Sequence, residues 1–306
     1  MSTIAASTFN ITLTNYAQGV AQDRRSAIAD FLAPQVPVGA ASGQYKRFNS
    51  KNAFVIYDTA RAIGGKATRI EFDADDPTFN CKPQGLEIVI DDHERDLAGV
   101  GDPLRLEQAK IDTLIGCNVA GHEVKVCAAV KAAIPAVSGV GEWSKAENDP
   151  VAELDAQIMA IAIATGQMPN AMTIGIGAWN LVRNHPKVVA RQPGAALIGL
   201  TLVQFASMLL NPSIEIKVAI LSKDLAKLGN AKNAANIFGN EVIVFLRSAT
   251  PTQFDPSMAK TFTIGEGLVG GVRQYREEPF NDVYLLEWSE DIEVTSTESA
   301  RRMAIS

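Results

Sequence analysis

Hydrophobic positions recur at helical spacing over an unusually long stretch that begins one third of the way along the chain. Between Asp102 and Pro135, apolar residues return every three, four or seven positions, and charged residues fall mostly elsewhere. Asp102 can cap a helix that starts at Pro103, and Pro135 prevents its continuation. The pattern predicts one helix over residues 103–134, about 48 Å long, that braces an extended object. The predicted buried residues are Leu104, Ile111, Ile115, Val119, Val126, Val130 and Ile134; the predicted solvated ones are Arg105, Lys110, Asp112, Glu123, Lys125 and Lys131.

Short β-prone runs separated by glycine turns cover residues 45–90 and predict a long hairpin with its tip at Gly64-Gly65. The charges are segregated, because Lys46, Arg47, Lys51, Arg61, Lys66 and Arg69 fill the first half, whereas Glu71, Asp73, Asp75, Asp76, Glu87, Asp91, Asp92, Glu94 and Asp96 fill the second. The two halves could pair within the hairpin or between copies of the chain. A hairpin with so little apolar content lacks a core of its own, so we expect it to lie on a neighbour.

The rest of the chain mixes helices and strands without a regular alternation, which predicts an α+β fold. Residues 1–43 read as an arm with a short helix over 21–32 that rests on a partner. Asp149, Pro150 and Gly166 mark the start and end of a second helix. Further helices are predicted over 179–183 and 201–210, and strands over 171–176, 214–220, 241–247, 261–264, 271–275 and 283–294.

Composition narrows the classes of function. The net charge of -6 and the pI near 5.2 argue against a protein that coats DNA or an anionic membrane, so any nucleic-acid contact is expected to be weak. Cys81, Cys117 and Cys127 form no CxxC motif, and we interpret them as reduced thiols of a cytoplasmic protein without a secretory signal. The uncharged runs 156–182 and 192–214 are broken by proline and polar residues, which favours buried elements over membrane spans.

Three groups of residues could mark a cofactor or metal site, and none fits such a site fully. Residues 265–270 match GxGxxG, but the following GVRQYREEP is β-prone, so a glycine-rich bend is favoured over dinucleotide binding. His93, His122 and His185 lack metal-ligand spacing, and the acidic run at Asp73, Asp75 and Asp76 lacks the rest of a calcium loop. We therefore predict no enzyme activity, no catalytic, cofactor-binding or metal-binding residue, and no cofactor.

The order of arm, charged hairpin, long helix, mixed α/β region and returning strands resembles the major capsid protein of tailed bacteriophages. The phrases FLAPQVPV, YKRFNSKNAF, DPVAELDAQIMAIAIATGQMPNAMTIG and WNLVRNHPKV are similar to that family, and the resemblance covers nearly the whole chain. It implies an N-terminal arm (1–44), an extended hairpin loop (45–90), a peripheral domain (91–150 and 272–306) with a spine helix over 103–134, and an axial domain (151–271).

The resemblance also implies a function. The subunit would assemble through hexamers and pentamers into an icosahedral virion shell around double-stranded DNA, inside the host bacterial cytoplasm and without a membrane. Portal, separate scaffolding and decoration proteins would be partners, and Lys46, Lys51 and Lys66 lie where some relatives form cross-links. Two alternatives are an encapsulin-like nanocompartment shell, which would differ in its neighbouring genes, and a soluble α/β enzyme, which would need a converging polar site.

Overall fold

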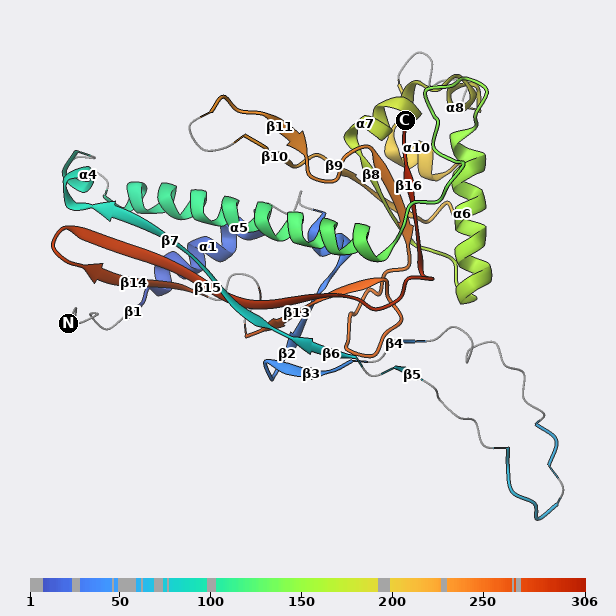
Figure 1. Cartoon of the computed structure of the whole chain (residues 1–306), viewed down its shortest axis with the longest axis horizontal. Coiled ribbons are helices and arrows are strands. Elements are labelled where there is room, and N and C mark those ends of the chain that lie inside the picture. Colours follow the sequence, from blue (N-terminus) through green and yellow to red (C-terminus); the bar gives the residue numbers. More distant parts are fainter. Residues whose placement is uncertain are drawn as a thin grey trace.

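The computed structural model of the chain has two lobes and a projecting hairpin (Figure 1). One lobe, which we call the long lobe, is built on a helix and a large sheet that run side by side. The other, the upright lobe, stands at one end of it, and the described part of the hairpin extends away from both. The structure describes residues 8–23, 28–45, 47–48, 59–61, 63–68, 74–75, 77–97, 103–191, 199–226, 230–265, 267 and 271–306.

The long helix is α5 (Pro103–Ala133), whose 31 residues span about 46 Å and confirm the helix predicted over residues 103–134. Ile111, Ile115, Val126 and Val130 are fully buried along it, as predicted. The prediction was wrong for Glu123, whose side chain is buried because its carboxylate accepts a backbone hydrogen bond from another segment. Asp102, the expected cap, lies outside the described residues.

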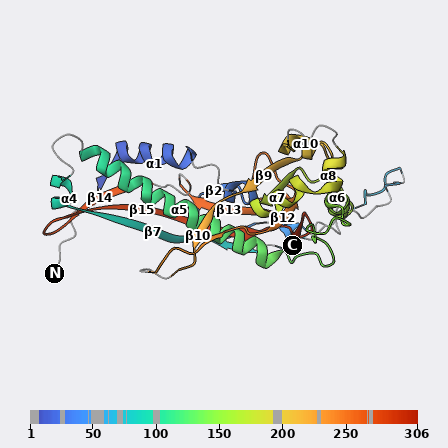
Figure 2. The same cartoon turned by 90° about the horizontal axis from the view of Figure 1, so that it is seen from above.

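The large sheet is organised around the long strand β15 (Asn281–Val294). Along one edge β15 pairs with all of β7 (Lys82–Asp91), and along the other it pairs first with β14 (Val272–Glu277) and then with β13 (Ala259–Ile264). Two arm strands complete the sheet, β1 (Thr8–Phe9) beside β14 and β2 (Gln35–Val38) parallel to β13. Helices α5 and α1 (Ile11–Asp23) lie side by side over the sheet (Figure 2).

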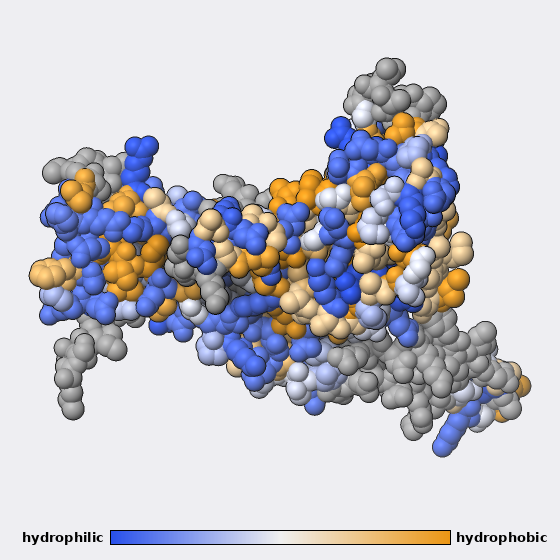
Figure 3. All heavy atoms as spheres, turned by 45° about the horizontal axis from the view of Figure 1, so that its top comes forward, coloured by the Kyte–Doolittle hydropathy of each residue, from blue (hydrophilic) through white to orange (hydrophobic). Residues whose placement is uncertain are grey.

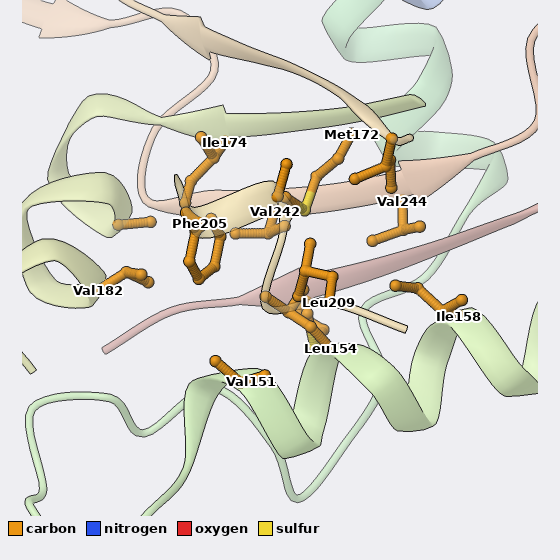
Figure 4. Packing of buried hydrophobic residues seen from close by; sticks show 14 of the residues in the cluster. Val151, Leu154, Ile158, Met172, Ile174, Val182, Phe205, Leu209, Val242 and Val244 are labelled. Atoms are coloured by element: carbon orange, nitrogen blue, oxygen red, sulfur yellow. The ribbon is translucent and has the colours of Figure 1, made fainter. Parts of the chain in front are cut away.

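The upright lobe contains a four-stranded sheet in the order β16-β12-β8-β9. Its best-defined helix, α6 (Pro150–Thr165), begins and ends as predicted: the Asp149 side chain accepts hydrogen bonds from the backbone N–H groups of Val151 and Ala152, and Gly166 closes the helix with a left-handed φ of 68°. The inner face of α6 packs against the sheet and against Phe205 and Leu209 (Figure 4). The other elements are β8 (Ala171–Gly175), α7 (Ile176–Asn184), α8 (Pro186–Arg191), α10 (Leu202–Ala206), β9 (Glu215–Ala219), β12 (Glu241–Phe245) and β16 (Ala300–Ala304).

Strand pairing divides the chain differently from the predicted boundaries. β7 was placed in the hairpin, but it lies in the large sheet because its even-numbered residues Leu86, Ile88 and Ile90 pack against the helices. β13 was placed with the axial domain and also lies in the large sheet, whereas β16 returns from the C-terminal end to the upright lobe and pairs with β12. Strand partners depend on contacts distant in the chain, which a local pattern does not contain.

The arm prediction was wrong in its helix and its packing. In place of one helix over 21–32, the structure has α1, which ends at Asp23, and a short helix α2 (Ala29–Leu32) that begins after Ile28; residues 24–27 lie outside the described residues. The Asn10 side chain accepts a hydrogen bond from the Leu13 backbone N–H, which caps α1, and Leu13 and Ala17 are buried one turn apart against α5. The described arm therefore packs against its own chain.

The remaining described elements are the ladders at the base of the hairpin, one short helix and one small hairpin. Two short ladders form the base of the hairpin, β3 (Ser42–Gln44) with β6 (Thr78–Asn80) and β4 (Arg47–Phe48) with β5 (Ala74–Asp75). Helix α4 (Asp92–Leu97) lies at the far end of the long lobe. A small hairpin of β10 (Ser222–Asp224) and β11 (Ala234–Asn236) projects from the upright lobe.

Candidate assembly surfaces

The base of the hairpin is fixed to the long lobe by aromatic packing and hydrogen bonds. The rings of Phe79 and Phe262 stack with their centroids 4.5 Å apart, and the Tyr45 hydroxyl donates a hydrogen bond of 3.0 Å to Glu293 Oε2. The Asn80 backbone N–H donates to Asp291 Oδ2 at 2.7 Å. Both acceptors lie on β15, so these contacts anchor the base of the hairpin to the central strand of the large sheet.

The described tip of the hairpin is exposed. Ile63 is fully exposed at 106%, and Gly64 turns the chain with a φ of 82°, which confirms the predicted tip. Arg61 and Lys66 are exposed on either side of that turn. The tip therefore presents one apolar and two basic side chains that no described part of the same chain covers.

The structure shows the partners of only some of the segregated charges of residues 46–96. The backbone register places Arg47 opposite Asp75, as the pairing within the hairpin requires. Other acids of the second half form pairs elsewhere in the chain: Asp92 binds Arg276, and Glu94 lies 2.7 Å from Lys110 Nζ. Lys46, Lys51, Arg69, Asp58, Glu71, Asp73 and Asp76 lie outside the described residues.

The far end of the long lobe carries a dense ion cluster. Arg95 lies 2.6 Å from Asp282 and 3.3 Å from Glu107, and the Tyr284 hydroxyl donates to Glu107 Oε1 at 2.8 Å. Burial, followed by the hydrogen bond to Glu107, raises the pKa of Tyr284, and the hydrogen bond from Arg276 is the main cause that lowers the pKa of Asp92. These pairs join α4, α5, β14 and β15 into one unit.

Two large apolar side chains protrude from that charged end. Leu97 is 74% exposed at the end of α4, and Phe280 is 61% exposed in the turn between β14 and β15. The Phe280 carbonyl accepts the Asp92 backbone N–H at 2.9 Å, which holds this turn beside α4. Figure 3 shows apolar groups among charged ones over this end of the molecule. Apolar side chains in a charged surround are typical of a contact surface.

The outer face of α6 is a further exposed apolar surface. Met159 and Ile163 are exposed one turn apart, with Ala152 and Ala156 on the same face. Sequence periodicity found the buried face of α6 but gave no reason to single out this one. Within the described residues, no helix is long and apolar enough to cross a lipid bilayer.

A buried polar network holds α5 on β15. His122 Nδ1 and Glu290 Oε2 lie 2.7 Å apart, and Lys125 Nζ donates to Glu290 Oε1 at 2.7 Å. Burial alone would raise the pKa of Glu290, but the hydrogen bonds and charges of His122 and Lys125 outweigh it and lower that pKa to about 2. His122, which lacks metal-ligand spacing in the sequence, is thus a buried residue of this network.

The other candidate groups do not converge. His185 is buried, with Nε2 3.2 Å from the Lys145 carbonyl oxygen, and no three His, Cys, Asp or Glu side chains of the described residues are placed to hold a metal ion. Cys81 and Cys127 are buried and Cys117 is exposed, all as free thiols. The strand β14 follows the glycine-rich segment, where a dinucleotide site would need a helix.

Comparison with known proteins gives a consistent result. No family model matches the chain. A protein of Pseudomonas phage JBD67 called "Major capsid protein" is 25% identical over 175 residues, which are 55% of this chain and 54% of the relative. Another of the same name from Burkholderia phage BcepMu is 26% identical over 194 residues, 58% of this chain and 59% of the relative. The chain thus matches just over half the length of each of these relatives.

Solved structures extend the match to nearly the whole chain. A phage-related protein from Bordetella bronchiseptica RB50 aligns with a TM-score of 0.75 at 19% identity, covering 98% of each chain. The capsid structure of cyanophage P-SCSP1u aligns with a TM-score of 0.54 at 13% identity, over 90% of this chain and 86% of the other. This chain has the tailed-phage capsid fold.

Proposed function

We propose that this protein is a shell-forming major capsid protein of a tailed phage. The observation that carries the proposal is the tailed-phage capsid fold combined with a hairpin whose described tip is exposed, with Ile63, Arg61 and Lys66 uncovered. The curated relatives with similar sequences are called major capsid proteins. A projecting two-stranded ribbon is only marginally stable alone, so a neighbouring copy would cover it.

Contact between copies would use opposite ends of the subunit. The basic tip lies beyond one end of the long lobe and the acidic α4 end lies at the other, so the two cannot meet within one chain (Figure 1). A contact between different patches on successive copies is heterologous, and such contacts close into rings when the rotation permits. Rings of six and five copies are the hexamers and pentamers that we propose for an icosahedral shell.

The contents and partners of the shell follow from the same proposal. The shell would enclose double-stranded DNA and would reside in the virion after assembly in the bacterial cytoplasm. A net charge of -6 suits a container from which DNA must leave, because an acidic subunit holds phosphates weakly. Portal, scaffolding and decoration proteins would be separate chains, and the protein would have a structural role without catalysis.

An encapsulin-like shell that holds an enzyme is the second candidate, because its subunit would need the same fold. A soluble enzyme has less support, since the described residues form no converging catalytic constellation. Particles purified from a host that also carries the neighbouring genes distinguish the candidates. A nuclease-protected DNA content supports the phage shell, whereas a co-purifying enzyme supports the nanocompartment.

The direct test of the shell proposal is electron microscopy and sedimentation of the purified full-length chain. We expect capsomers or closed shells. A chain that remains monomeric at all concentrations and ionic strengths, with a hairpin that resists protease, would contradict the proposal.

A further inference from the structure

The arm helix α2 lies at the junction of the two lobes. All of residues 28–33 except the exposed Asp30 belong to a single buried cluster, which also contains side chains from α5, from both sheets and from the loop before β12. The members of this cluster from the arm are Ile28, Ala29, Phe31, Leu32 and Ala33; those from α5 and the segment after it are Val126, Cys127, Val130 and Ile134; those from the rest of the chain are Ala171, Ala219, Ile237, Phe238, Ile243, Phe245, Met258, Ala259 and Ala300. The single helical turn of α2 therefore packs between the two lobes and contacts both.

Phe31 makes the contact with the upright lobe. Its ring meets that of Phe245 on β12 edge to face, with centroids 5.4 Å apart. Two cations of the same lobe approach the Phe31 ring: Lys217 Nζ lies 4.6 Å and Arg247 Cζ lies 5.1 Å from its centroid. A ring approached by two cations and an aromatic edge is held in orientation as well as in place.

The backbone of the same segment is held by the long lobe. Glu123 Oε2 on α5 accepts a hydrogen bond of 2.9 Å from the Ile28 backbone N–H, where both groups are buried. At the other end of α2, the Thr261 hydroxyl on β13 donates to the Ala33 carbonyl oxygen at 3.0 Å. α2 therefore contacts α5 and the large sheet through its backbone and the four-stranded sheet through Phe31.

A second connection between the lobes lies at the C-terminal end of α5. Glu241 on β12 lies 3.2 Å from Lys131 Nζ and 3.1 Å from Arg302 Nη1, and Arg302 Nε donates to the Ile134 carbonyl oxygen at 2.7 Å. Lys131 follows Glu123 by eight residues, or about 12 Å along a helix. α2 and this polar connection are thus two separated contacts between the lobes. They add to the apolar cluster shared with α5 and to the crossover between the sheets, where the Leu246 backbone N–H donates to the Ser299 carbonyl oxygen.

We propose that α2 is a wedge that sets the angle between the two lobes, which pivot about the Lys131, Glu241 and Arg302 connection. Phe31 is held by Phe245 and by two cations of the upright lobe, so loosening α2 would widen the range of angles that this lobe samples without unfolding either lobe. This coupling goes beyond shell formation. It assigns to an arm segment, which is distant in sequence from the upright lobe, control over how the lobes are oriented.

The test measures the distance between the lobes by double electron–electron resonance. Spin labels go on native Cys117, which is exposed on α5, and on Ala152→Cys, an exposed position on α6; Cys81 and Cys127 are buried. Labelled full-length chain is diluted with unlabelled chain so that only distances within one chain contribute. Mass spectrometry confirms two labels per chain.

Phe31→Leu is the test variant and Phe205→Leu is the matched control, because both rings are fully buried but Phe205 belongs to the core of the upright lobe alone. We expect Phe31→Leu to widen the distance distribution about twofold and Phe205→Leu to leave it unchanged. An unchanged width in Phe31→Leu, or equal widening in both variants, would overturn the proposal.

A second variant keeps the test decisive if Phe31→Leu does not fold. Lys217→Gln with Arg247→Gln removes both cations from the ring but leaves every apolar contact of α2 in place, and both side chains are partly exposed. We expect a smaller widening than for Phe31→Leu, and no widening in this double variant would refute the wedge. Because the measurement is within one chain, its failure leaves the shell proposal to be judged by microscopy.

Discussion

The arm and the hairpin both precede α5 and were both expected to rest on a neighbour, but the arm packs against its own chain and the described hairpin tip does not. The arm buries Leu13, Ala17 and Phe31 against its own chain, whereas the tip of the hairpin leaves Ile63 fully exposed. The difference lies in apolar spacing: Leu13 and Ala17 fall one helical turn apart and fit the groove beside α5. A segment with few charges is therefore not automatically an intersubunit arm, and the hairpin is the stronger candidate for that role.

The largest expected effect concerns the cluster that buries the arm helix. Ile115 is fully buried there together with Leu13 and Ala17. Ile115→Asp places an unpaired charge in that core, which costs several kcal/mol, and we expect no soluble folded protein. The control is Cys117→Asp, two residues along on an exposed position, which should stay folded by circular dichroism. Equal solubility of the two variants would contradict the burial of this face.

A smaller effect separates an intramolecular arm from an intersubunit one. Leu13→Ala should lower the free energy of unfolding by roughly 2–4 kcal/mol, because a buried leucine loses its packing, whereas Ile11→Ala should change it by less than about 0.5 kcal/mol. Ile11 is the matched control, since it is exposed on the same helix. Urea unfolding of unassembled protein measures both. If neither substitution affects it, the arm is not part of the subunit core.

The buried contact between Glu123 and the arm predicts a dependence on pH. Burial raises the pKa of Glu123 from an ordinary 4.5 to about 7, against the hydrogen bonds from Ile28 and Ala29 and the charge of His122; Asp30 raises it further. Between pH 4.5 and 7 the folded chain retains a proton that the unfolded chain has released, so stability should fall as pH rises, by roughly 3 kcal/mol in all.

Glu123→Gln keeps a side-chain acceptor for the Ile28 N–H but cannot titrate. We expect the difference in unfolding free energy between pH 5 and pH 8 to shrink by roughly 2–3 kcal/mol in this variant. Glu290 titrates in a different window, because its pKa is lowered to about 2, so its contribution is complete above pH 4.5 and lost only as pH falls toward 2. An unchanged difference between pH 5 and pH 8 would mean that Glu123 stays ionised in the folded chain.

The smallest effect on the fold, near zero, is expected at the hairpin tip. Arg61→Glu with Lys66→Glu reverses two exposed charges and should not shift the melting temperature. Assembly should weaken, and the loss of assembly on adding salt should be reduced in this variant, since screening acts on exposed charge pairs. Light scattering from low to molar salt gives both quantities. If the light scattering of the unaltered chain does not change from low to molar salt, copies of the chain are not held together by charge pairs.

The sequence predicted a helix or strand correctly where the residues that determine it lie within that element. α5 and α6 were predicted to within a few residues because periodicity, Asp149, Gly166 and the flanking prolines all lie within the element. The strand β16 was not predicted, and the structure shows what holds it: Arg302 pairs with Glu241 and donates to the carbonyl oxygen of Ile134, both distant in the chain. The order of strands in the sheets could not be predicted either, because strand partners are distant in the chain.

The candidate surfaces show the same limit. The tip at Gly64 was predictable from its turn residues, but the buried role of Glu123 was not, because its partner at Ile28 is 95 residues away. The exposed Leu97 and Phe280 come from segments distant in sequence that the pairing of β7 with β15 brings together. A charged or apolar residue shows its role only once the fold has placed it beside its partner.

The most direct test of the account is deletion of residues 62–67, which removes the hairpin tip and nothing from the buried clusters. Circular dichroism, melting and sedimentation are measured on the deletion and on the full chain under conditions in which the full chain assembles. We predict the same cooperative melting of the unassembled subunit and a complete loss of capsomers and shells. A deletion variant that unfolds, or one that still forms shells as the full chain does, would contradict the claim that the hairpin joins copies while the lobes hold the fold.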